Sequence, residues 1–172
     1  MDLDGFDDYD HIPEFDRNRF SGRDEGEEWK HNHIDECSRN LYNKAKEIYK
    51  LTRSLTDLFP EAEQAEYIKS VLIGNASIIP AKIIGAQRGF YSMQMEKAVI
   101  VKMNIVELRN TLWMCLAENW CDESYVEMVR AEIEQFRLLF IDWIKSFDKT
   151  NDFADEWHLF NDPETFPKDD EE

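Results

Sequence analysis

Residues 34–60 read IDECSRNLYNKAKEIYKLTRSLTDLFP, and this stretch decides the fold class. Its core-facing positions are separated by three, four or seven residues, which is the spacing of one face of an α-helix. These positions are Ile34, Leu41, Ala45, Ile48, Thr52, Leu55 and Phe59. We therefore predict a helix over about 34–59, followed by a break at Pro60, whose ring disrupts a continuing helix.

Three further stretches show the same helical spacing. We predict helices over about 61–87, 90–119 and 122–147, joined by short connections. Asp122 suits the start of the last helix because its side chain can accept hydrogen bonds from free backbone N–H groups. Short connections favour antiparallel neighbours, so residues 34–149 predict an all-α, up-down-up-down four-helix bundle.

The third predicted helix carries two apolar stripes. One stripe contains Val101, Ile105, Leu108, Leu112 and Cys115, and the other repeats every seven residues at Val99, Val106, Trp113 and Trp120. A helix in an isolated four-helix bundle needs one apolar stripe. The second stripe therefore predicts a contact with an arm of the chain or with another subunit. For Trp113 and Trp120, packing in the core of the bundle is the default interpretation, and a role in this contact is the alternative.

The net charge of −17 lies in the two ends of the chain. Residues 1–36 contain 13 acidic and 4 basic residues, and residues 150–172 contain 9 acidic and 1 basic residue. The middle of the chain has 15 residues of each sign. We predict an acidic N-terminal arm over 1–33, a neutral bundle over 34–149 and an acidic C-terminal arm over 150–172.

Both arms contain aromatic residues among their acids, which is unusual for an inert linker. In the C-terminal arm Phe153, Trp157, Phe160 and Phe166 alternate with carboxylates, a pattern typical of acidic–hydrophobic recognition segments. We expect this arm to dock on its own bundle, on a neighbouring subunit or on a protein partner. A solvated tail is the alternative for both arms.

A basic face on the first predicted helix is the candidate surface for a polyanion. It contains Arg39, Lys44, Lys46, Lys50 and Arg53. The acidic arms would repel a nucleic acid or compete for the same cations, so we do not expect the full-length chain to bind one. An arm that masks this face until a partner removes it is a second hypothesis.

No motif for catalysis or for cofactor binding is visible in the sequence. The stretch 31–37 contains two histidines, two acids and a cysteine, but consecutive residues at a helix start point in different directions, so no metal site is expected. His158 has no visible orienting partner, which a general base requires. The three cysteines lack zinc or redox spacing and are expected to be reduced thiols.

The order of signals over residues 41–147 resembles a bacterial family of small helical proteins. The matching segments are Lys46-Glu47-Ile48-Tyr49-Lys50-Leu51-Thr52, Phe59-Pro60, Ile79-Pro80-Ala81-Lys82-Ile83 and Glu107-Leu108-Arg109. The family is that of the 23S ribosomal RNA intervening-sequence proteins, which are related to the accessory protein of diversity-generating retroelements. The resemblance implies a left-handed four-helix bundle without catalysis and a ring-like homo-oligomer, a pentamer in the best-known relatives. The retroelement relative is basic and binds RNA and a reverse transcriptase, whereas this chain is acidic.

These observations together favour a cytoplasmic, non-enzymatic interaction or scaffold protein without a cofactor or metal. It would self-assemble through its bundle and use its acidic–aromatic arms to contact a protein partner that the sequence does not identify. We expect no membrane contact, because no apolar run approaches the roughly 18 residues of a span and the acidic start lacks a signal-peptide pattern. The alternative function is a nucleic-acid-associated accessory factor that acts through the basic face or together with an enzyme such as a reverse transcriptase.

Overall fold

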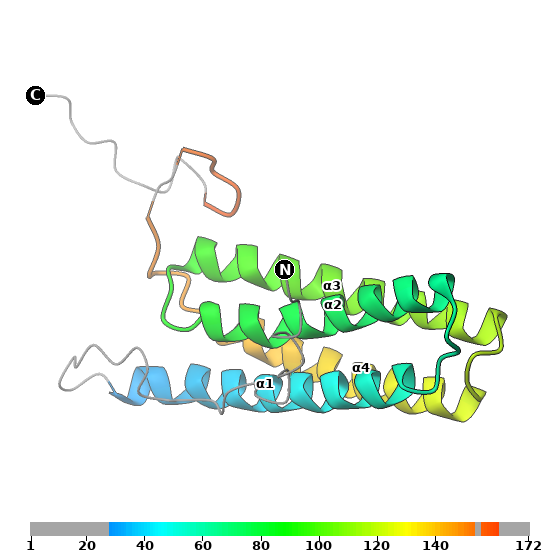
Figure 1. The fold of residues 1–172 in the computed structure, drawn as a ribbon. Helices are drawn as coiled ribbons and strands as arrows, with labels where there is room; N and C mark the ends of the chain where they lie inside the picture. The colour runs from blue at the N-terminus through cyan, green and yellow to red at the C-terminus, as the bar shows by residue number, and fades with distance from the viewer. Residues whose placement is uncertain (1–27, 154–155, 162–172) are drawn as a thin grey trace, which may run out of the picture.

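Four helices pack side by side with alternating direction in a computed structural model, which describes residues 28–153 and 156–161, with side chains from residue 33 onward (Figure 1). The helices are α1 (Glu28–Thr56), α2 (Glu63–Gly85), α3 (Tyr91–Ala117) and α4 (Glu123–Lys145). Each helix contacts the next one in the chain, and α4 returns to α1. This arrangement confirms the predicted all-α four-helix bundle.

The first helix begins at Glu28 rather than near Ile34, so residues predicted to belong to the N-terminal arm are helical. The acidic composition of this stretch argued for an arm, but carboxylates in the first turn of a helix interact favourably with its dipole. The other three helices begin and end within a few residues of their predicted bounds.

One core lies along the axis of the bundle. The predicted stripe of α1 is buried from Leu41 to Leu55, and the first stripe of α3 is buried from Val101 to Cys115, as expected. The largest buried side chain is that of Trp143 on α4. Its indole N–H donates to Ser38 Oγ on α1 at 3.0 Å, so this polar group is satisfied inside the core.

An ion pair between a buried carboxylate and a half-buried arginine holds the connection between α2 and α3 against α1. The carboxylate of Asp35 is almost inaccessible, and its Oδ2 lies 3.7 Å from the guanidinium of Arg88. Arg88 has a φ of 52°, in the left-handed region that turns the chain at the end of a helix. The ion pair thereby connects the start of the bundle to the turn that positions α3.

Helix α2 is apolar around most of its circumference. By length and composition alone it could cross a membrane, with a mean hydropathy of 1.3 over an 18-residue window. The sequence predicted this helix but not its high mean hydropathy, because small and polar residues interrupt its apolar runs. In the bundle α2 packs between α1 and α3, and Leu72, Ile79 and Ile83 lie in the core.

Candidate interaction surface on helices α3 and α4

Helices α3 and α4 share the least extensive contact of the four neighbouring pairs, and a groove lies between them. Its volume is about 340 Å³. The apolar lining consists of Ile105, Val106, Ile133, Phe136, Phe140, Ile141 and Ile144. Protein interiors are close-packed, so an open apolar groove of this size indicates a surface suited to a further contact.

Cations surround this apolar groove. Lys102, Arg109 and Arg137 line it together with one acid, Glu134, which pairs with Arg137 at 2.8 Å. Within the described residues, neither Lys102 nor Arg109 forms an ion pair or a side-chain hydrogen bond. The groove therefore combines an apolar floor with two cations that are available to an acidic ligand.

Arg109 also borders a second hollow of about 440 Å³, which continues along α3. Asn110, Trp113 and Arg130 complete its lining. Arg130 is paired with Glu127 at 2.8 Å, so its charge is already partly neutralised. The Trp113 side chain is 64% exposed and lines this hollow together with Arg109.

Three of the four residues predicted as the second stripe of α3 lie at this surface. Val99 and Trp113 are exposed, and Val106 is half-buried in the lining of the groove. The structure adds one exposed apolar side chain of the groove lining that the sequence analysis missed, Ile141 on α4. Met103 on α3 and Leu138 on α4 are also exposed, but they do not line the groove. We call Val99, Val106, Trp113, Ile141 and the groove the α3/α4 surface.

Trp120, the fourth predicted member of the stripe, lies elsewhere. Helix α3 ends at Ala117, and Asn119 adopts a φ of 54°, which turns the chain before Trp120. The Trp120 ring packs on Phe59 with 5.3 Å between ring centroids. Trp120 therefore closes the end of the bundle, because the seven-residue repeat does not continue past the end of the helix.

The beginning of the C-terminal arm is docked at the start of α3. Asn151 O accepts a hydrogen bond from Tyr91 N at 2.8 Å, and the Phe153 ring meets Phe90 edge-on at 4.8 Å. Helix α3 has no acidic residue in its first turn and no side-chain cap of its own. Asp152 supplies both, because its Oδ1 accepts hydrogen bonds from the Ser92 backbone and hydroxyl.

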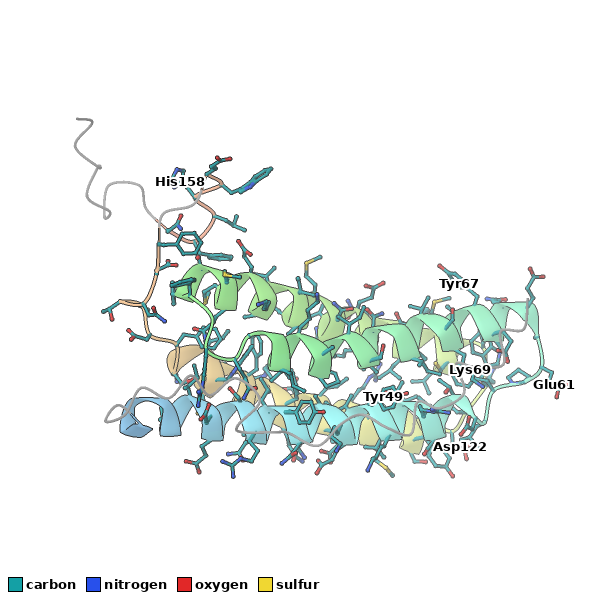
Figure 2. All side chains as sticks on the ribbon, turned by 60° about the vertical axis from the view of Figure 1, so that its left-hand side comes forward. Tyr49, Glu61, Tyr67, Lys69, Asp122 and His158 are labelled. Atoms are coloured by element: carbon teal, nitrogen blue, oxygen red, sulfur yellow. The ribbon has the colours of Figure 1, made fainter. Side chains whose placement is uncertain are left out.

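The following part of the arm projects sideways from the bundle near the start of α3, where Figure 2 shows His158. Trp157 is 87% exposed and Leu159 is 64% exposed, whereas Phe160 is half-buried. Asn161 is buried and donates from Nδ2 to Phe153 O at 2.7 Å, which brings the two ends of this loop together. Phe166, also predicted to dock, lies outside the described residues.

The predicted basic face of α1 loses one member. Lys44 is directed toward α4, where its Nζ lies 2.7 Å from Glu132 Oε2 and 3.1 Å from Gln135 Oε1. Hydrogen bonds to Glu132 and Glu47 raise the pKa of Lys44. At 3.6 residues per turn Lys44 lies well around the helix from Arg39. Arg39 and Lys50 are exposed, and Lys46 and Arg53 are half-buried on the same side of α1.

The three thiols are not activated as nucleophiles. Burial raises the pKa of Cys115 to about 12, and burial is also the main cause that raises the pKa of Cys37 and of Cys121. A reactive cysteine requires the opposite shift. In the described part of the chain, no group of three or more His, Cys, Asp and Glu side chains could hold a metal ion.

Comparisons with protein-family models, with curated proteins and with solved structures find no significant match to this chain. The class that the fold defines is a four-helix bundle, in which the described residues leave an apolar groove open between α3 and α4.

Proposed function

We propose that this protein is a non-enzymatic interaction or scaffold protein that self-associates through the α3/α4 surface. The observation that carries this proposal is an open apolar groove lined by Val106 and exposed Ile141, which adjoins exposed Trp113 through Arg109. Contiguous apolar surface of this kind marks interaction sites in soluble proteins. The proposal includes protein contacts through the acidic–aromatic arms and a reducing, cytoplasmic location, which suits three unpaired thiols.

The gain from association comes from apolar burial. Fully burying one large apolar side chain contributes about 1.5–3 kcal/mol. Several such side chains on one surface can offset the translational and rotational entropy lost on association, which costs about 4–15 kcal/mol. Spacing by seven residues along α3, from Val99 through Val106 to Trp113, is also the repeat by which helices pack against one another. A ring-like oligomer, as the family resemblance implies, is part of this proposal.

Sedimentation velocity of the full-length protein tests self-association. The wild type should sediment as an oligomer, and Trp113→Asp should sediment as a monomer because a charge enters the apolar contact. Tyr67→Asp is the matched control, since Tyr67 is 66% exposed but lies on the outer side of α2 (Figure 2). A monomeric wild type, or equal behaviour of the two variants, would contradict the proposal.

A nucleic-acid-associated accessory factor is the second candidate. It is supported by Arg39, Lys46, Lys50 and Arg53 on one side of α1, although Lys44 does not contribute. Binding to phosphates weakens steeply with salt. If this function holds, the full-length chain should retard RNA or DNA in gels at low salt, and Lys46→Glu with Lys50→Glu should abolish the shift. No retardation at low salt would exclude it.

A further inference from the structure

The molecule exposes both an apolar acceptor and an acidic–aromatic ligand. The acceptor is the α3/α4 groove with Lys102 and Arg109 beside it. The ligand is the loop over 156–161, which exposes Trp157 and Leu159 beside Glu156. The arm beyond Thr150 contains nine acidic residues and one basic residue, so its charge is opposite to that of the two cations at the groove.

We propose that the 156–161 loop of one copy binds the α3/α4 groove and the adjoining hollow between Arg109 and Trp113 of a second copy. In this contact Trp157 packs against Trp113 and the guanidinium of Arg109, which combines apolar burial with a cation–π interaction. Glu156, the acidic residue of the loop, lies opposite Lys102 and Arg109. The inference rests on the proposed self-association and names the segment that mediates it.

The loop cannot fill this part of the groove in its own chain. Phe153 is held at Phe90, at the start of α3. Arg109 lies roughly 19 residues farther along the helix, or about 28 Å at 1.5 Å per residue. The hydrogen bond from Asn161 to Phe153 folds the loop back on itself. The tip of such a loop reaches at most about 14 Å from Phe153, so a neighbouring copy must supply the Trp157 that reaches Arg109.

The contact is heterologous, because each copy offers one loop and one groove. Contacts of this type run head to tail and form either a closed ring or an open chain. They also allow two different defects to complement each other. A copy with a damaged loop still has an intact groove, and a copy with a damaged groove still has an intact loop.

Mixing two full-length variants tests this contact directly. The loop variant carries Trp157→Ser and Leu159→Ser, and the groove variant carries Lys102→Glu and Arg109→Glu. All four positions are exposed, so the bundle should remain folded, which far-UV circular dichroism verifies. Each variant alone should be monomeric. An equimolar mixture should form a heterodimer, because one intact loop meets one intact groove and no further pair remains.

The results separate this inference from the proposed function. If the loop variant remains oligomeric while Trp113→Asp is monomeric, the α3/α4 surface self-associates without the loop, and only the loop contact is overturned. If both variants are monomeric but their mixture is also monomeric, the loop contact is overturned as well. A heterodimer that dissociates in high salt, as partly exposed ion pairs predict, supports the contact. A monomeric wild type overturns both proposals.

Discussion

Asp152 Oδ1 accepts two hydrogen bonds from Ser92, one from the backbone N–H at 3.2 Å and one from the hydroxyl at 2.7 Å. The two residues are far apart in the sequence, so a residue of the C-terminal arm caps an internal helix. This cap fixes the point from which the 156–161 loop projects. The stability of α3 and the position of the loop are therefore connected through one carboxylate.

Replacing this cap should weaken the start of α3. We expect Asp152→Ala to lower the free energy of unfolding by about 1 kcal/mol, the usual cost of losing a helix cap. Amide hydrogen exchange should accelerate over residues 91–95. Asp142→Ala is the control, because Asp142 forms an exposed pair with Lys145, and such pairs contribute little. Equal exchange in the two variants would show that Asp152 does not cap α3 in solution.

The Ser38–Trp143 hydrogen bond should contribute to the stability of the core. Ser38→Ala leaves the buried indole N–H without its acceptor, which costs about 1–3 kcal/mol. Trp143→Phe removes the donor and also creates a cavity. In urea unfolding, the double variant should lose less free energy of unfolding than the two single variants lose together. The reason is that the double variant has no indole N–H left without an acceptor. Additive effects would show that the two groups do not interact.

The Cys115 thiol should make stability depend on alkaline pH. Burial raises its pKa from 9.0 to about 12, so the thiol ionises more readily in the unfolded chain than in the folded one. The protonated Cys115 thiol therefore contributes fully to the free energy of unfolding below about pH 9, and this contribution is lost as the pH rises toward 12. Urea unfolding over this range should show a shallower decline for Cys115→Ala than for the wild type. Parallel curves would contradict the assigned burial.

Local periodicity was sufficient to predict the bundle. Leu41, Ile48 and Leu55 are buried because steps of three and four residues place them on one side of α1, whatever the helix packs against. The start of α1 was predicted too late because the acidic residues before Ile34 were assigned to an arm. Acidic residues are also favourable at the N-terminus of a helix, so their presence does not exclude helix. Trp120 was misplaced because a turn at Asn119 ended the repeat, and the sequence pattern alone gives no φ value.

The interaction surface was predicted only in part. Val99, Val106 and Trp113 were found because their repeat is strict, whereas Ile141 was missed because its exposure depends on the separation of α4 from α3. Lys44 was assigned to a solvent-facing cluster, but it lies at the edge of the core stripe, where a long side chain can reach Glu132. Such cross-helix contacts depend on tertiary packing rather than on spacing along one helix.

A native mass spectrum of the full-length protein, recorded over a dilution series, tests the central claim most directly. The account predicts a homo-oligomer of defined subunit number without bound nucleic acid, and a monomer for Trp113→Asp under the same conditions. A wild-type monomer at every concentration would contradict self-association through the α3/α4 surface. An oligomer that Trp113→Asp leaves intact would contradict the assignment of that surface, and a complex with RNA or DNA would favour the accessory-factor function.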